Sequence, residues 1–118
     1  MKVLLQTESP LMAVRLKDNI IKSVKGQIEG VKIETWSYIK SSDNFDVIYH
    51  NPQQYIDYPE RNVLFRVEVD GSIVSLSTAW WKRNLEPSIE MMCLHTGRLT
   101  EMLLRYFRNS YIKYSIVD

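Results

Sequence analysis

The sequence is poor in the residues that form metal sites and catalytic motifs. Its 118 residues include one cysteine, two histidines and four glycines, and the glycines stand apart from one another. A lone cysteine excludes an internal disulfide, and isolated glycines exclude a glycine-rich phosphate loop. No cysteine pair, His-x-x-x-His step or carboxylate-rich calcium loop occurs. The sequence therefore predicts no catalytic residues, no metal site and no cofactor, gives an enzyme no support, and leaves Cys93 as an expected buried apolar thiol.

Long apolar runs are missing as well. Gln6, Glu8 and Pro10 interrupt the N-terminal apolar run before it reaches the length of a signal-peptide core, and no later window approaches the roughly 20 apolar residues of a membrane span. The formal net charge is +1, which does not indicate wholesale binding of nucleic acid or of an acidic membrane surface. We expect a soluble cytoplasmic protein, folded as a single globular domain over residues 1–118.

The clearest structural signal lies between Asn62 and Trp81. The dipeptide Asp70-Gly71 suits a two-residue type I′ turn, in which both central residues have positive φ. Pairing outward from this turn predicts a hairpin with these partners: Val69 with Ser72, Val67 with Val74, Phe65 with Leu76, and Val63 with Thr78. The opposite face then carries the polar residues Arg66, Glu68, Ser75 and Ser77. One face is therefore predicted to be core and the other to be largely solvated.

The remaining pattern predicts an α+β domain. Ser9 and Pro10 suit the start of a helix, which Gly30 is expected to end. The apolar positions of this helix recur at helical spacing: Ala13, Leu16, Ile20, Val24 and Ile28. Strands are predicted over 2–7, 31–40, 45–50 and 111–117, with a hairpin loop at 41–44. The predicted fold is a curved antiparallel sheet, in the order β-α-β-β-β-β-α-β, with two helices packed on one face.

Residues 85–108 allow two interpretations. Apolar residues on steps of three and four favour one helix, with Ile89, Met92, Leu99 and Leu103 toward the sheet and Asn84 as its N-cap. Against this stands Gly97, which costs about 1 kcal/mol inside a helix. The alternative is a strand over 88–94, with a helix that begins near Thr96.

The two histidines have a functional and a structural interpretation. His50 ends a predicted strand beside Asp46 and Asn51, where a general base could lie. His95 lies among apolar residues of the second predicted helix. We favour ordinary structural roles for both, because neither belongs to a recognisable constellation.

Residues 80–83, Trp80-Trp81-Lys82-Arg83, place stacking surface beside positive charge, as single-stranded nucleic-acid binders do. The predicted register weakens this signal, because Trp80 would continue the core face and only Trp81 would point outward. Nucleic-acid binding is therefore not expected.

The first hairpin gives the better indication of function. Placing Val31, Ile33, Ile39 and Ile48 on one aliphatic face leaves Trp36, Tyr38, Val47 and Tyr49 on the other. Further aromatics follow at 55–58, and the charged residues between 41 and 60 are all acidic. We expect a surface for a basic protein partner, made of Trp36, Tyr38, Asp43, Asp46, Tyr49, Tyr55, Asp57, Tyr58 and Glu60. The alternative is that the 51–61 loop folds over these aromatics as a small satellite core.

These observations predict a non-enzymatic protein-binding domain. A concrete version is a small cytosolic inhibitor, immunity- or antitoxin-like, that covers a basic site on its partner. The alternative is a small-molecule-binding or enzymatic α+β domain with a pocket between helix and sheet, using His95, Tyr106 or His50.

Overall fold

A computed structural model describes the chain except for residue 32 and the ranges 53–61 and 82–85. The described elements confirm the predicted order β-α-β-β-β-β-α-β and the α+β class. Their bounds are β1 Lys2–Gln6, α1 Pro10–Val24, β2 Trp36–Lys40, β3 Asp46–His50, β4 Leu64–Asp70, β5 Ile73–Ala79, α3 Ile89–Phe107 and β6 Lys113–Val117.

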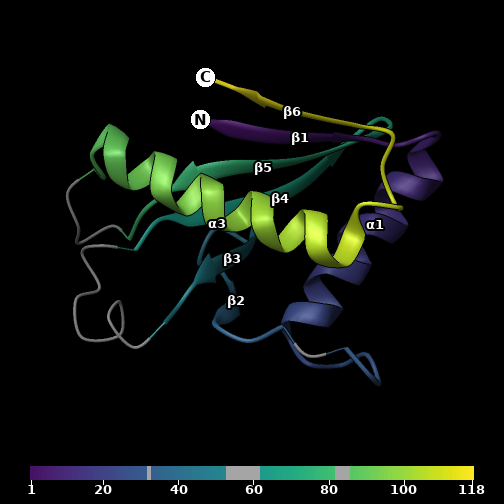
Figure 1. The fold of residues 1–118 in the computed structure, drawn as a ribbon, viewed down its shortest axis with the longest axis horizontal. Helices are drawn as coiled ribbons and strands as arrows, with labels where there is room; N and C mark the ends of the chain where they lie inside the picture. Colours follow the sequence, from purple (N-terminus) through teal and green to yellow (C-terminus); the bar gives the residue numbers. More distant parts are fainter. Residues whose placement is uncertain (32, 53–61, 82–85) are drawn as a thin grey trace.

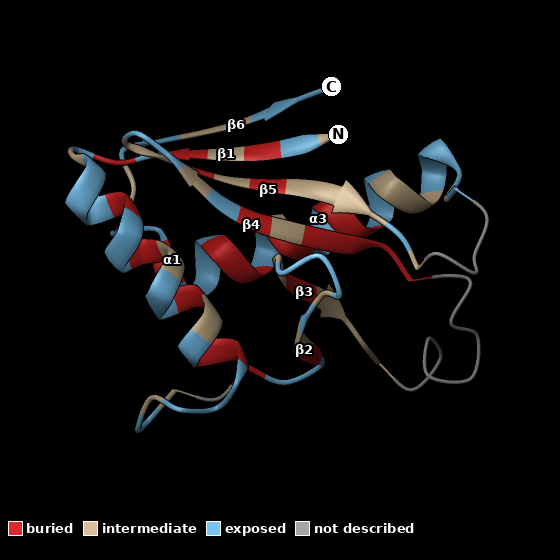
Figure 2. Ribbon diagram, turned by 180° about the vertical axis from the view of Figure 1, so that it is seen from behind, coloured by how far each residue is buried: buried red, intermediate tan, exposed pale blue. Residues whose placement is uncertain are grey.

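The strands form one open antiparallel sheet in the order β2-β3-β4-β5-β1-β6 (Figure 1). The N-terminal strand β1 therefore lies inside the sheet, between β5 and β6, while β2 and β6 form its edges. Alternate strand residues such as Val3 and Phe65 join Leu16 of α1 and Leu99 of α3 in one core cluster, which gives the sheet a helix-facing side. Figure 2 shows this buried layer between the helices and the strands. We call the opposite side the outer face.

Helix α1 begins as the sequence predicts and ends earlier. The Ser9 side chain accepts a hydrogen bond from the Met12 amide at 3.2 Å, as an N-cap does. At the other end Gly26 takes φ +72° and donates to the Ser23 carbonyl at 3.1 Å, while Gln27 donates to the Lys22 carbonyl at 2.9 Å. This pair of bonds is a Schellman motif. The predicted end at Gly30 is therefore wrong, because the earlier glycine closes the helix.

Helix α3 is continuous over residues 89–107, so the interpretation of 88–94 as a strand is wrong. Its N-cap is Ser88, whose side chain accepts from the Met91 amide at 3.2 Å; the predicted cap, Asn84, lies outside the described residues. Leu99 and Leu103 face the core as predicted, whereas Ile89 is 56% exposed and does not. Cys93 is exposed, which corrects the expectation of a buried thiol.

The second hairpin has the predicted faces with a different turn. Asp70 pairs with Ile73, so the two turn residues are Gly71 and Ser72, and only Gly71 takes a positive φ, +59°. A positive φ at the first central position alone is the pattern of a type II′ turn, which makes the predicted type I′ turn wrong. Phe65 consequently pairs with Thr78. The register differs from the prediction by two residues, so every side chain keeps its face.

The first hairpin has different faces from those predicted. A four-residue loop at 41–44 would pair Lys40 with Phe45, whereas Lys40 pairs with Asp46 and Phe45 belongs to the loop. The loop is held by hydrogen bonds between Ser41 and Phe45, one from each backbone amide. One extra loop residue turns every side chain of β3 to the other side relative to β2.

Candidate functional site

The structure divides the aromatic residues of the predicted partner surface between two faces. Trp36 is 8% exposed and packs toward Phe65 in the core, at 6.3 Å between ring centroids, and Tyr38 lies on the same side of the sheet. Tyr49 lies on the outer face, where its ring contacts that of Trp81 at 5.6 Å. The predicted common aromatic face is therefore wrong. The other predicted residues of this surface, Tyr55, Asp57, Tyr58 and Glu60, lie outside the described residues.

Asp46 is the centre of a charge cluster between α1 and the first hairpin. Its carboxylate accepts a hydrogen bond from the Tyr38 hydroxyl at 2.6 Å and pairs with Lys17 at 3.0 Å and Lys40 at 3.2 Å. Burial by itself raises the pKa of Asp46, but the hydrogen bonds from Tyr38 and the two lysines outweigh it and lower the pKa to about 2. The same carboxylate raises the pKa of Tyr38 to about 12.

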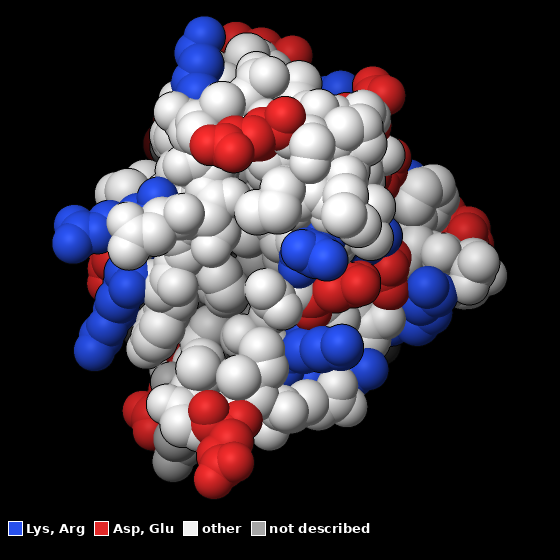
Figure 3. Space-filling view, turned by 90° about the vertical axis from the view of Figure 1, so that its right-hand side faces the viewer, with Lys and Arg blue, Asp and Glu red and all other residues white. Residues whose placement is uncertain are grey.

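Asp43 is also matched by a cation from elsewhere in the chain. It pairs with Arg66 at 3.2 Å, and the Arg66 guanidinium lies 4.3 Å above the Phe45 ring. Both described acidic residues of the 41–60 segment are therefore compensated. Figure 3 shows basic and acidic groups interspersed on the side of the molecule that carries α1, rather than a region of one sign.

The outer face has an apolar hollow of about 380 Å³ beside the first hairpin. Val47, Leu64, Ala79, Trp80 and Trp81 are among its lining residues. Trp80 is 39% exposed, so its predicted place on the core face is wrong. The basic half of the expected stacking platform, Lys82 and Arg83, lies outside the described residues.

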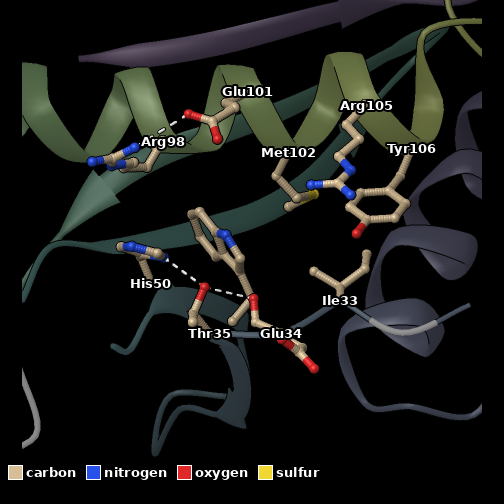
Figure 4. A pocket seen from close by; sticks show the side chains of 10 residues that line it. Ile33, Glu34, Thr35, His50, Arg98, Glu101, Met102, Arg105 and Tyr106 are labelled. Carbon is tan, nitrogen blue, oxygen red and sulfur yellow. Dashed lines mark hydrogen bonds and ion pairs between the residues drawn. The ribbon is translucent and has the colours of Figure 1, made fainter. Parts of the chain in front are cut away.

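A larger cavity, of about 540 Å³, lies between α3 and the segment that enters β2 (Figure 4). Three parts of the chain line it: the segment before and at the start of β2, the end of β3, and one face of α3. Its lining residues are Ile33, Glu34, Thr35, Trp36, His50, Arg98, Glu101, Met102, Arg105 and Tyr106. Two residues named for the predicted helix-sheet pocket, His50 and Tyr106, are thus at one cavity, while His95 is fully buried with its ring 6.3 Å from that of His50.

Helical spacing explains how α3 forms one wall of the cavity. Arg98, Met102 and Arg105 follow one another at intervals of four and three residues, which places them along one side of the helix. Met102 is 4% exposed and belongs to the core, so it forms an apolar floor between two arginines. The cavity therefore has an apolar base and a charged rim.

Thr35 contributes a strained backbone to the opposite wall. Its φ is +65°, a conformation that costs a β-branched residue about 1–3 kcal/mol. Its carbonyl accepts from the Asn51 amide at 2.5 Å, and its hydroxyl donates to the Glu34 carbonyl at 2.6 Å. The hydroxyl also lies 3.4 Å from Nδ1 of His50. Such strain persists only where neighbouring contacts hold it, and it concentrates at binding sites.

The charges around the cavity are unequally compensated. Arg98 pairs with Glu101 at 3.3 Å, whereas the Arg105 guanidinium lies 5.4 Å from the centre of the Tyr106 ring and has no ion pair with the described residues. Burial lowers the pKa of His50, and the nearby Arg98 charge lowers it further. The lowered pKa favours the neutral imidazole, whose Nδ1 faces the Thr35 hydroxyl.

Sequence reasoning missed most of this cavity. The spacing of Arg98, Met102 and Arg105 was a usable signal for a mixed helix face. No local sequence pattern indicated the positive φ of Thr35, because this conformation depends on the position at which the chain enters β2.

The described residues contain neither a metal-ligand cluster nor a helix that could span a membrane. Within them, no three His, Cys, Asp or Glu side chains lie close enough to hold a metal ion. Neither of the described helices is sufficiently long and apolar to span a bilayer.

Comparisons with protein-family models, curated proteins and solved structures found no match. Function must therefore be argued from the sites themselves.

Proposed function

We propose that this protein is a small-molecule-binding domain whose ligand occupies the cavity between α3 and the start of β2. The observation that carries the proposal is the convergence of three separated chain segments on one space of about 540 Å³. Ligand sites are commonly concave, with volumes of about 300–1,000 Å³, an apolar lining and a few placed polar groups. Ile33, Trp36 and Met102 supply the apolar part here, and Thr35, His50 and the arginines supply the polar part.

The cavity is better supported than the protein-binding surface expected from the sequence. That expectation depended on exposed aromatics sharing one face and on uncompensated acidic charge. Trp36 is buried, Tyr49 lies on the other side of the sheet, and Asp46 is paired with two lysines. Both arguments for a basic partner are therefore weakened.

The experiment is an NMR titration of the labelled protein with a library of small metabolites. We expect the ligands to shift the backbone amides of Thr35, His50 and Arg105. A matched pair of variants tests the location: Glu101→Trp obstructs the cavity rim, and Glu90→Trp places the same side chain on the same helix away from it. Ligands should bind Glu90→Trp as they bind wild type and should lose at least about tenfold in affinity, or about 1.4 kcal/mol, for Glu101→Trp. Undiminished binding to a folded Glu101→Trp variant would place the ligand elsewhere.

A second candidate function is immunity- or antitoxin-like binding of a partner protein in the cytoplasm. The partner would bind the outer face of the sheet. The observation that favours it is the apolar hollow of about 380 Å³ lined by Val47, Leu64 and Trp81, with Trp80 39% exposed beside it. Partner capture with wild type and with Ala79→Arg, which places charge in the hollow, tests it. Equal capture of the same partner by both would place the interface elsewhere.

A further inference from the structure

Arg105 differs from the other charged residues of the cavity. Arg98 is paired with Glu101 at 3.3 Å, while Arg105 has no ion-pair partner among the described residues. Figure 4 shows the Arg105 guanidinium directed from α3 into the cavity, beside the Tyr106 ring, and the Glu34 carboxylate directed away from it. Arg105 can therefore bind a ligand without giving up an ion pair to any of the described residues. A guanidinium presents a planar set of donors that matches carboxylate and phosphate oxygens.

The far side of the cavity has a different chemistry. His50 and Thr35 lie across it from Arg105 (Figure 4). The Thr35 hydroxyl and His50 Nδ1 are 3.4 Å apart, and together they supply neutral hydrogen-bonding groups. The other lining residues include the apolar Ile33, Trp36 and Met102. The Trp36 and His50 rings lie 5.2 Å apart and are tilted by 45° to each other, so both contribute aromatic surface to the cavity.

We infer that the ligand is a small aromatic acid whose carboxylate or phosphate group binds Arg105 and whose opposite end carries a hydrogen-bonding group for Thr35 and His50. This inference rests on the proposed small-molecule function and adds the class of ligand. The aromatic body lies on Trp36 and Met102, where a flat apolar group loses its contact with water. The anion lies at the rim, where Arg105 holds it without first giving up another ion pair.

The test uses three probes that differ at one end. 4-Hydroxybenzoate carries a carboxylate, 4-hydroxybenzamide replaces it with a neutral amide of similar shape, and 4-hydroxyphenyl phosphate replaces it with a phosphate. Binding is measured by NMR titration. We expect 4-hydroxybenzoate to bind at least about tenfold more tightly than the amide, since charge-assisted hydrogen bonds are about twice as strong as neutral ones. The ratio of the affinities for the carboxylate and the phosphate probe distinguishes a carboxylate site from a phosphate site.

Variants of α3 locate the anion. Arg105→Ala should weaken binding of the anionic probes about tenfold and change binding of the amide much less, because only the anions make charge-assisted hydrogen bonds with the guanidinium. Arg105→Lys should lose less, because it retains a point charge without the planar donors. Arg108→Ala is the matched control, since this exposed arginine caps the same helix and does not line the cavity. It should bind every probe as wild type does.

The outcomes separate this inference from the proposed function. Equal affinities for the acid and the amide, or anion affinities unchanged in Arg105→Ala, would overturn the aromatic-acid ligand and leave the cavity as a binding site. A metabolite screen that yields only neutral ligands at the cavity would do the same. Absence of any ligand, among the probes and the library together, would overturn both.

Discussion

The two hairpins of the sheet differ in how firmly their sequences determine their faces. In β4–β5 the apolar and polar residues alternate. The observed register differs from the predicted one by two residues, so every side chain lies on its predicted face. In β2–β3 apolar residues occur on both faces, and one extra loop residue reversed the assignment of β3. A face assignment is thus robust where the alternation is clear and fragile where the loop length alone determines it.

The outer face of the sheet is not solvated throughout. Val47 of β3 and Leu64 of β4 are outer-face residues, yet they are 2% and 6% exposed and lie outside the main core cluster. The outer face therefore has its own apolar region beside the first hairpin. The second hairpin places polar side chains on this face: Arg66, Glu68, Ser75 and Ser77.

The largest expected effect tests the faces of both hairpins. Trp36→Ala and Phe65→Ala should each lower the free energy of unfolding by about 3–5 kcal/mol, because each removes an aromatic side chain from the core. Tyr49→Ala, on the outer face, should cost clearly less, about 1–2 kcal/mol. Chemical denaturation measures all three. Similar losses for Trp36→Ala and Tyr49→Ala would instead support the shared face expected from a four-residue loop.

A smaller effect is expected at the charge cluster that joins β2–β3 to α1. Asp46→Asn should cost about 2 kcal/mol at pH 7, because it removes the charge that accepts from Tyr38 and pairs with Lys17. The pKa of Asp46, about 2 in the folded protein, lies below its ordinary value of 3.8. Its stabilisation is therefore complete above about pH 4 and is lost as the pH falls from about 4 toward 2.

Urea denaturation at a series of pH values measures this contribution. The difference in unfolding free energy between wild type and Asp46→Asn should shrink across that acid range. A difference that stays constant from pH 7 to pH 2 would show that the ionised carboxylate is not what stabilises the hairpin.

The turn of the second hairpin should show an effect of about 1 kcal/mol. Gly71 has φ +59° and no neighbouring atom where a methyl group would lie, so Gly71→Ala should cost about 1–2 kcal/mol through backbone strain alone. Asp70 is a strand residue, so Asp70→Thr should stay within about 0.5 kcal/mol of wild type. Thermal unfolding compares the two variants. Equal losses would support the type I′ turn, in which Asp70 also needs a positive φ.

The smallest effect is expected at the exposed pair between the two hairpins. Asp43→Asn should change stability by less than about 0.5 kcal/mol, because both partners of the Asp43–Arg66 pair are well exposed and an exposed ion pair contributes little. High salt should leave this difference near zero. A loss as large as that of Asp46→Asn would mean that the 41–45 loop depends on this pair for its shape.

The sequence by itself determined the order of the elements, the start of α1, the continuity of α3 and the alternating faces of β4–β5. Each depends on residues close together in the chain: a cap beside its helix, a stripe of apolar positions, a turn between two strands. The pocket between helix and sheet was also anticipated at Tyr106 and His50, as an alternative.

Only the tertiary structure decided which side of the sheet Trp36 and Tyr49 occupy, and that β1 lies between β5 and β6. It also decided that Arg105, Thr35 and His50 line one cavity, and that Asp46 is neutralised by Lys17 of α1. These outcomes depend on contacts between residues far apart in the chain. Local periodicity carries no information about such contacts, because it records which side of an element is apolar and not which other element covers that side.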